Sequence, residues 1–300
     1  MHDNPLVSVI VLSYNNLKYF KQCIDSILLQ DYNNIEIIVS DDCSEKFPIE
    51  YFREYIEKYK GSNIVNYKII SNEKNVGTVK NFNNAIRESN GTYIISLAID
   101  DCFYDRNVVN SIVESFITNK CLILTGYKAV CEEGNDEPSY MEPKQSQIRL
   151  LNEGGNKLFR ALCEGNFISG ACTSYHRSFF EKYGYFNEEY RLLEDYPKYL
   201  KIVREGEKIY FLNIPLIKYR LGGVSTSKKP NPILAQDLAL SIKKEILLHK
   251  DKIGFFIYRL KKFEYCRINK SLPMYVLCLI YLDVVFYKKL KHFFRVVGCG

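Results

Sequence analysis

The alternation of buried strands with amphipathic helices over the first hundred residues constrains the fold of this chain more than any other feature. Near-continuous runs of β-forming residues are typical of strands buried on both faces of a parallel sheet. Four such runs occur: "LVSVIVLSYN" (6–15), "IEIIVSDDCS" (35–44), "NYKIISN" (66–72) and "GTYIISLAIDD" (91–101). Helices are expected between them, near 20–28, 50–60 and 78–89. This order predicts an α/β fold, a mostly parallel sheet flanked by helices.

The rest of the chain predicts further elements of both kinds. A helix is expected over 107–118, a strand at "CLILTGYKAV" (121–130) and a polar loop over 132–147. A short strand and a helix are expected within 162–190. "LLEDYPKYLKIVREG" (192–206) is typical of a helix that opens with two acids, and 208–226 predicts a pair of strands. From about residue 231 the chain is expected to be helical.

Polar side chains follow three of the predicted strands. They are Ser13-Tyr14-Asn15, Asp41-Asp42 and Asp100-Asp101. The carboxyl ends of parallel strands share one edge of a sheet, and ligands bind beyond that edge. Such acids also cap turns, and Glu194-Asp195 also suits a plain helix start. Their repetition at three strand ends favours a binding site.

Cysteine usage and hydropathy limit the class of protein. The 300 residues include ten cysteines, scattered singly with no C-x-x-C, and four histidines. This pattern argues against a zinc site or a disulfide framework and favours reduced thiols in the cytoplasm. No secretory signal is evident. The most apolar window, 274–287, is too short to span a membrane and contains Asp283.

Positive charge is concentrated at the C-terminal end. Residues 243–300 carry 13 Lys and Arg against 4 Asp and Glu, whereas the remainder carries 28 against 31. Basic tails meet nucleic acid or anionic membranes. The apolar and aromatic residues between these charges favour a membrane surface, and the body shows no base-reading module, so no nucleic-acid partner is expected.

Several motifs together resemble the family 2 glycosyltransferases of the GT-A fold. They are "VSVIVLSYN", "SILLQDYNNIEIIVSDDCS", "NVGTVKNFNNAI", "GTYIISLAIDD", "LLEDYPKYLKI" and "YRLGGVST". They occur in the family's order over about residues 6–227. The resemblance implies a Rossmann-like GT-A domain over 1–230. Residues 231–300 lie outside it as a basic, amphipathic helical region, with membrane association or an acceptor-side element as hypotheses.

The resemblance implies an inverting transfer from a nucleoside-diphosphate sugar, with a UDP-sugar favoured, assisted by Mn²⁺ or Mg²⁺. Glu194 and Asp195 take the catalytic positions, with Asp195 as the base. Asp100 and Asp101 take the metal and ribose positions. Tyr219 and Arg220, with Ser225 beyond, are expected to approach the diphosphate from a mobile loop. The remaining donor-binding positions are Leu12, Ser13, Tyr14, Asp41, Asp42, Asn75, Gly77 and Asn81.

Two positions depart from the family's common pattern. Ala98 replaces the first acid of Asp-x-Asp-Asp, and Gly222 replaces a histidine available to the metal. These departures leave open which of Asp100 and Asp101 holds the metal. They also leave a non-catalytic nucleotide-sugar-binding protein as an alternative. A nucleotidyltransferase is a second alternative, because such enzymes also combine an α/β nucleotide fold with acids and a metal. The favoured hypothesis is an enzyme of bacterial surface polysaccharide (capsule or O-antigen) synthesis, acting on a glycan or lipid-linked glycan at the cytoplasmic face of the membrane.

Overall fold

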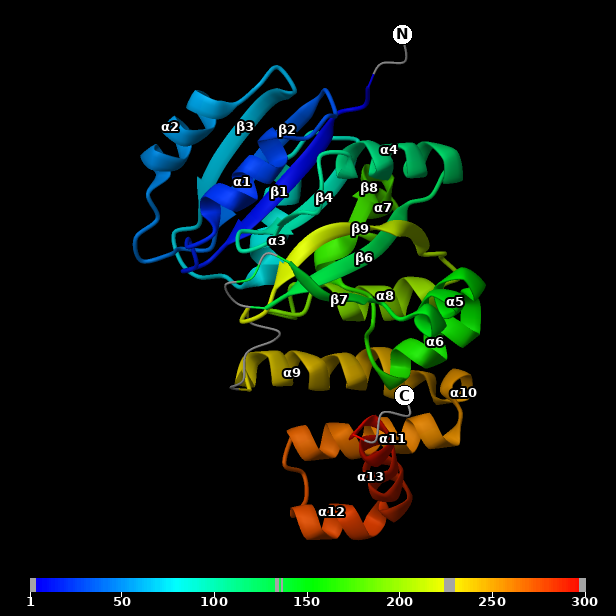
Figure 1. The fold of residues 1–300 in the computed structure, drawn as a ribbon. Coiled ribbons are helices and arrows are strands. Elements are labelled where there is room, and N and C mark those ends of the chain that lie inside the picture. Colours follow the sequence, from blue (N-terminus) through cyan, green and yellow to red (C-terminus); the bar gives the residue numbers. More distant parts are fainter. Residues whose placement is uncertain (1–3, 133–134, 136, 224–229, 297–300) are drawn as a thin grey trace.

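The sheet at the centre of the molecule is mostly parallel, as predicted (Figure 1). The structure, a computed structural model, describes residues 4–132, 135, 137–223 and 230–296. Strand order is β3-β2-β1-β4-β8-β6-β9-β5, with β7 paired to β6. The parallel strands at one side are β3 (Ile64–Ser71), β2 (Ile35–Asp41), β1 (Val7–Ser13) and β4 (Tyr93–Ala98).

The other half of the sheet mixes strand directions. β8 (Thr173–His176) runs antiparallel to both β4 and β6 (Ile123–Cys131), and β9 (Tyr210–Arg220) runs parallel to β6. Two short antiparallel strands, β5 (Cys102–Phe103) and β7 (Pro138–Glu142), pair with β9 and β6. The carboxyl ends of β1, β2, β4, β6 and β9 therefore point to the same side of the sheet.

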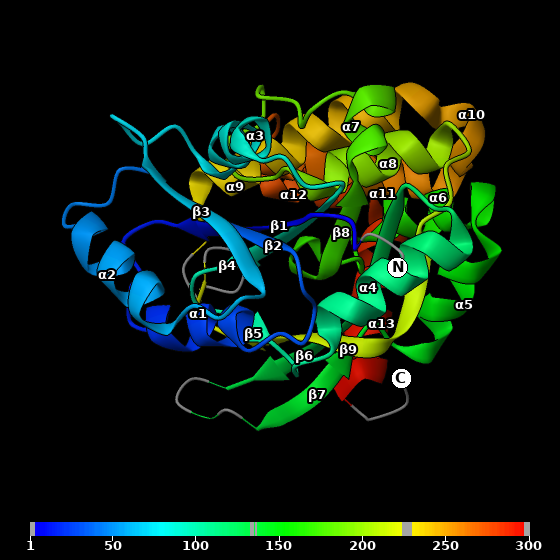
Figure 2. The same ribbon diagram turned by 90° about the horizontal axis from the view of Figure 1, so that it is seen from above.

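Two hydrophobic layers cover the sheet because side chains alternate between its faces along each strand. In β1, Val9 and Val11 enter one core and Ile10 enters the other. The first core packs against α1 (Phe20–Leu28), α2 (Ile49–Tyr59) and α4 (Val108–Asn119). The second packs against α3 (Thr78–Glu88), α6 (Gly155–Glu164), α7 (Arg177–Tyr183) and α8 (Asp195–Arg204). Figure 2 shows α1 and α2 on the opposite side of β1–β3 from α3.

The C-terminal helices divide into a part that joins the main body and a part that extends from it (Figure 1). They are α9 (Pro232–Ser241), a π- and 3₁₀-helical segment (Ile242–His249), α10 (Lys250–Ile253), α11 (Phe255–Ile268), α12 (Met274–Ile280) and α13 (Leu282–Val296). Ile242, Ile246, Ile253 and Ile257 belong to the second core. Leu260, Phe263, Leu277 and Val284 form a separate small cluster. The core of the α/β body therefore extends past residue 230.

Two predicted segments differ from the structure. The predicted loop 132–147 contains β7 and the start of α5 (Gln145–Glu153), and the predicted strand pair 208–226 is the single strand β9. β7 is largely exposed, so it carries no apolar alternation by which sequence reasoning finds strands. β9 continues past Pro215, which lacks a ladder N–H, because the register with β6 shifts on both sides of Tyr127.

The apolar window 274–287 is not one helix. It is divided between α12 and α13 at Tyr281. Within the described part of the chain, no helix has the length and apolarity needed to cross a membrane.

Glu36 provides a test of what holds the strands in register. Its side chain, 1% exposed, accepts hydrogen bonds from Ser8 Oγ at 2.6 Å, from Gly91 N at 3.0 Å and from Asn90 N. Glu36→Ala would remove the acceptor of the buried Ser8 hydroxyl and of Asn90 N and leave Gly91 N with Ser8 Oγ alone, so we expect a loss of about 3 kcal/mol in the free energy of unfolding. Urea unfolding followed by circular dichroism measures it. The control is Glu54→Ala on the exposed face of α2; equal stability of the two variants would contradict the assignment.

Candidate active site

A cavity of about 1150 Å³ lies beyond the carboxyl ends of β1, β2 and β4. The polar residues after these strands lie at its edge, as the sheet topology requires. The N-terminus of α8 and the end of β9 close its other sides. The predicted residues that line the cavity are Leu12, Ser13, Tyr14, Asp42, Asn75, Asn81, Asp100, Asp101, Glu194, Asp195, Tyr219 and Arg220.

Asp41 and Gly77 lie behind the cavity wall. Asp41 is fully buried, and its carboxylate accepts from Ser44 N at 2.8 Å and from Ser44 Oγ at 2.5 Å. It therefore holds the turn after β2. Gly77 N donates to Asp42 Oδ2 at 2.8 Å. Gly77 has a φ of +89°, and a Cβ there would lie 2.5 Å from the carbonyl oxygen of Arg191, so only glycine fits.

Asp42 lines the cavity but is firmly anchored by its neighbours. Its Oδ1 accepts from Val76 N at 2.8 Å and from Asn72 Nδ2 at 3.1 Å. With the bond from Gly77, these contacts tie the end of β2 to the loop that leads into α3. Asn81 accepts from Ser40 Oγ at 2.7 Å and fixes the same helix against β2. The backbone around Asp42 is thereby rigid before any ligand binds.

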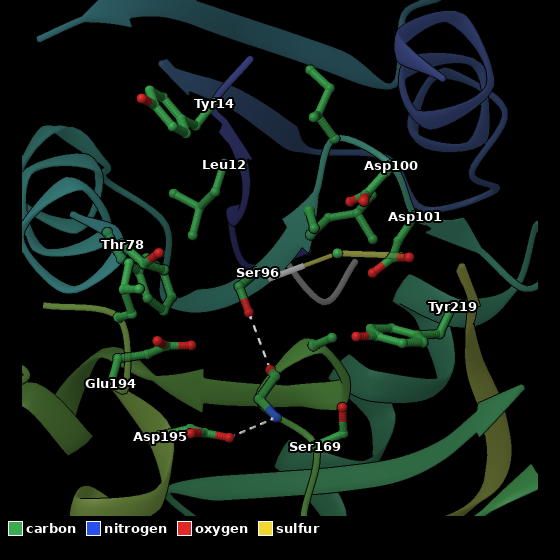
Figure 3. Close-up of a pocket in the computed structure, with 18 of the residues that line it drawn as sticks. Leu12, Tyr14, Thr78, Ser96, Asp100, Asp101, Ser169, Glu194, Asp195 and Tyr219 are labelled. Atoms are coloured by element: carbon green, nitrogen blue, oxygen red, sulfur yellow. Dashed lines mark hydrogen bonds between the residues drawn. The ribbon is translucent and has the colours of Figure 1, made fainter. Parts of the chain in front are cut away.

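Asp100 and Asp101 lie at the loop after β4, opposite Glu194 and Asp195 across the cavity (Figure 3). Asp100 Oδ2 accepts from Asn16 Nδ2 at 3.0 Å. Asp101 is 1% exposed; its Oδ1 accepts from Arg220 N at 2.9 Å, whereas its Oδ2 is buried with no hydrogen-bond partner among the residues that the structure describes. Burial, and next the charge of Asp100, raise the pKa of Asp101 well above its usual range. Burial also raises the pKa of Asp100.

Tyr219 and Arg220 are the last residues of β9 and do not stand on a loop, which corrects the prediction. Ser225 lies outside the described residues. The Arg220 guanidinium donates from Nη1 to the carbonyl oxygen of Asp100 and from Nη2 to Gln22 Oε1, both at 2.6 Å. The central carbon of the guanidinium, Cζ, lies 4.3 Å from the centre of the Tyr19 ring. Strand β9 thus brings a fixed positive charge to the two acids.

Asp195 is the first residue of α8 and Glu194 is its N-cap, where the N-terminal dipole favours negative charge. Asp195 Oδ2 accepts from Gly170 N at 3.1 Å and from Asn166 Nδ2 at 3.4 Å, and Oδ1 accepts from Tyr196 N at 2.6 Å. Figure 3 shows the Gly170 contact, and Ser96 Oγ donates to the carbonyl of the same residue at 3.4 Å. Burial, and next the charge of Asp195, raise the pKa of Glu194 to about 8. Burial raises the pKa of Asp195 as well.

Asp237 is a positioning residue that sequence reasoning missed. It lies on α9, is buried, and its Oδ2 accepts from the backbone N–H groups of Arg191, Leu192 and Leu193 at 2.9, 2.6 and 3.2 Å. These residues lead directly to Glu194. No local signal marks this role, because Asp237 and the loop it holds are more than forty residues apart. Asn16, Asn166 and Gly170 were missed for the same reason.

A hard divalent cation needs oxygen ligands such as carboxylates, and the acids after β4 are the candidates here. Among the described side chains, no group of three His, Cys, Asp or Glu gathers to hold a metal. Asp100 and Asp101 supply two carboxylates, and the unpartnered Asp101 Oδ2 is the kind of oxygen that a hard cation satisfies. Mg²⁺ is commonly bound by one or two carboxylates together with substrate phosphates and water. The acidic pair fits such a partial site.

Solved structures share this fold. S. aureus TarS 1-349 in complex with UDP-GlcNAc aligns with a TM-score of 0.60 and 20% identity over 89% of this chain and 73% of its own. The mannosyltransferase PcManGT from Pyrobaculum calidifontis, in complex with GDP-Man and Mn²⁺, aligns with a TM-score of 0.61 and 16% identity over 97% of this chain and 84% of its own. The fold is therefore that of the GT-A glycosyltransferases, as predicted.

Sequence comparison gives the family. The model described as Glycosyl transferase family 2 matches residues 8–184. An uncharacterised glycosyltransferase of Haemophilus influenzae is 29% identical over 262 residues, 86% of this chain and 78% of that protein. One of Rickettsia conorii is 31% identical over 235 residues, and the match spans 75% of this chain but 36% of that longer protein. The chain belongs to glycosyl transferase family 2. It spans about a third of the length of the Rickettsia relatives from R. felis and R. conorii. Membership of this family disfavours the nucleotidyltransferase alternative.

The raised pKa of Glu194 predicts how stability depends on pH. Between pH 5 and pH 8 the folded chain binds more protons at Glu194 than the unfolded chain does, so this residue lowers stability as the pH rises. Glu194→Gln removes the charge and keeps the shape. We compare the free energy of unfolding of this variant with that of the parent protein at each pH. The difference should be more favourable to the variant at pH 8 than at pH 5, by roughly 1–3 kcal/mol.

The measurement is urea unfolding at several pH values. Glu188 is the matched comparison, because its bonds from Asn83 and Arg87 lower its pKa. Glu188→Gln should therefore change stability at pH 8 in the opposite direction. A parallel pH dependence for Glu194→Gln and the parent protein would show that Glu194 ionises as an ordinary carboxyl group.

Proposed function

We propose that this glycosyltransferase inverts the anomeric carbon as it moves a sugar from a nucleoside diphosphate, with UDP favoured, to a hydroxyl group of a glycan or lipid-linked glycan. The observation that carries the proposal is the opposition of two acidic pairs across one cavity, Asp100-Asp101 and Glu194-Asp195. An inverting displacement needs a base on the side of the sugar opposite the leaving group. Donor sugars bound by the neighbours, UDP-GlcNAc and GDP-Man, support the donor class.

The donor end of the cavity is the edge formed by β1, β2 and β4. Leu12, Ser13 and Tyr14 would line the nucleotide pocket. The carboxylate of Asp42 would accept a hydrogen bond from the ring N–H of the nucleotide base. Asn75 and Asn81 would flank the ribose, while Asp41 and Gly77 keep the backbone of this wall in place. Tyr219 and the buried Arg220 would meet the diphosphate, where a cation stabilises the developing negative charge.

A divalent cation, Mn²⁺ or Mg²⁺, would be held by Asp100 and Asp101. When bound, it supplies positive charge that stabilises the leaving diphosphate. Asp101, with its unpartnered Oδ2, is the stronger candidate ligand, and Asp100 remains available to the ribose. Ala98 and Gly222 contribute no ligand, so this chain would rely on the two acids together with donor phosphates and water.

Asp195 would act as the general base on the acceptor hydroxyl. Its carboxylate is oriented by Gly170 N and Asn166 Nδ2. The raised pKa makes Asp195 a stronger base than an ordinary aspartate, and it takes the hydroxyl proton as the bond to the anomeric carbon forms. Burial raises the pKa of Glu194 to about 8, so its protonated form would place no second full charge beside the base.

The biological task that we propose is bacterial surface polysaccharide synthesis at the cytoplasmic face of the membrane. The protein EpsJ of Bacillus subtilis, named as an uncharacterised glycosyltransferase, is 27% identical over 230 residues. The region 231–300 would contact the membrane peripherally. Its large exposed apolar side chains on α11–α13 include Phe255, Tyr275, Leu279, Phe286 and Phe293. Lysines such as Lys289 accompany them and suit an anionic lipid surface.

Asp195→Asn tests the base. We expect kcat to fall by about 10²–10⁴-fold while donor affinity stays nearly constant, because the amide keeps the shape but cannot accept the proton. Transfer from a panel of UDP- and GDP-sugars, followed by release of the nucleoside diphosphate, measures it. Asp251→Asn, an exposed carboxyl on α10, is the control. Retention of more than a tenth of the parent's turnover would remove Asp195 from this role.

Asp101→Asn tests the acid pair at the donor end. The nucleotide-sugar should raise the melting temperature of the parent protein more with Mn²⁺ than without it, because a ligand that binds only the folded state stabilises it. In Asp101→Asn the increment due to Mn²⁺ should disappear. Asp31→Asn, an exposed aspartate paired with Arg106, should keep it. A full Mn²⁺ increment in Asp101→Asn would assign the metal elsewhere.

A further inference from the structure

A second, smaller cavity of about 390 Å³ adjoins the catalytic side of the first. Asn166, Leu193 and Leu234 line both cavities. Asn166 also donates to Asp195 Oδ2, so the second cavity begins next to the proposed base and away from the acids after β4. Its far wall is formed by α11 and α13, outside the residues that match the family model.

Three lysines line this second cavity, which we call the lysine pocket: Lys261, Lys288 and Lys291. Lys261, 5% exposed at its side chain, forms an ion pair with Glu264 at 2.8 Å. Neither Lys288 nor Lys291 has an ion-pair partner among the described residues. Two carboxylates also line the pocket: Glu164, which is exposed to solvent, and Glu264, whose charge acts on Lys288 as well as on Lys261. Positive charge therefore exceeds negative charge at a partly enclosed position.

A large part of the remaining wall of the lysine pocket is apolar. Leu193, Leu234, Leu238, Leu260 and the ring of Tyr287 line it. The helix that carries Lys288 and Lys291 also carries large apolar side chains that are exposed, Phe286 at 69% and Leu290 at 42%. Figure 1 shows α11, α12 and α13 together on the far side of α9 from the sheet. Exposed apolar side chains therefore lie on the same helix as the two lysines.

We propose that the lysine pocket binds the phosphate or diphosphate of a lipid-linked sugar acceptor, an inference that rests on the proposed transferase function. Lys288 and Lys291 would bind the phosphate oxygens, and the leucines would contact the first part of the lipid chain. The sugar of the acceptor would extend past Asn166 and present its hydroxyl group to Asp195. The lipid tail would leave over α12 and α13, whose exposed apolar side chains meet the membrane.

The position of the lysine pocket and its apolar wall distinguish this ligand from the donor diphosphate. The donor diphosphate is expected at Asp100, Asp101 and Arg220, on the opposite side of the first cavity. None of these three residues lines the lysine pocket. A phosphate bound there belongs to a second molecule, and the adjoining apolar wall favours one with a hydrocarbon chain.

Farnesyl diphosphate is a water-soluble probe of this site. It is titrated into the full chain by calorimetry, with UDP and Mg²⁺ saturating the first cavity. We expect the double variant Lys288→Gln and Lys291→Gln to raise its Kd by about ten- to a hundredfold, since charge-assisted bonds are lost. The control with the same loss of charge is Lys250→Gln with Lys252→Gln, two exposed lysines on α10 outside the pocket. It should leave Kd unchanged.

Three kinds of result would overturn the proposal. The first is absence of binding to the parent protein, or equal Kd in both double variants. The second is inorganic diphosphate binding as tightly as farnesyl diphosphate, because the apolar wall would then contribute nothing. The third is seen with vesicles of phosphatidylglycerol: selective loss of sedimentation by the pocket variant, with farnesyl diphosphate binding unchanged, would assign these lysines to membrane headgroups instead.

Binding of UDP and of a UDP-sugar, measured in the same samples, separates this inference from the function on which it rests. Intact donor binding without farnesyl diphosphate binding would overturn the lysine pocket alone. Loss of both in the parent protein would count against the proposed function. Melting temperatures of the two double variants close to that of the parent protein establish that they are folded.

Discussion

Four carboxyl groups face one cavity, and their mutual repulsion and desolvation are the constraint on which the rest of the site depends. Burial raises the pKa of each of them. The chain offsets this cost with fixed donors: Arg220 N to Asp101, Asn16 to Asp100, and Gly170 N to Asp195. Backbone N–H groups are effective donors here because the fold holds them in place before a ligand arrives.

These donors come from distant parts of the chain, so the site exists only when the sheet is complete. Arg220 reaches Asp100 and Asp101 because β9 crosses beside β5 and ends at the acids. Asp195 meets Gly170 because the short segment before β8 lies under the start of α8. A change in strand register would separate each donor from its acid, which couples the stability of the sheet to the chemistry of the cavity.

The C-terminal region is part of this arrangement. Asp237 on α9 receives three backbone N–H groups from the segment that precedes Glu194, and Ile242 and Ile246 fill the core beneath α8. The family match ends at residue 184, yet the helices beyond residue 231 hold the segment that leads to Glu194 and Asp195 and line the second cavity. The same region thus connects the position of the proposed base to the surface where a lipid acceptor would arrive.

The sequence by itself determined the α/β class, the mostly parallel sheet and the acids at the ends of its strands. These features follow from local periodicity, because a buried strand must be apolar along its length and must become polar where it leaves the core. Strand β7, the continuity of β9 and the fixed position of Arg220 were not predicted, since an exposed edge strand and a shifted register leave no local pattern.

Only the tertiary structure decided which acids act together and which are structural. Asp41 and Asp42 are adjacent in sequence, yet Asp41 holds a turn behind the wall while Asp42 faces the cavity. Asp237, Asn166 and the lysines of α11 and α13 carry no motif, and their roles arise from contacts between segments far apart in the chain. Residue type and spacing report what a segment can do locally, whereas the packing of the helices on the sheet fixes which side chains meet.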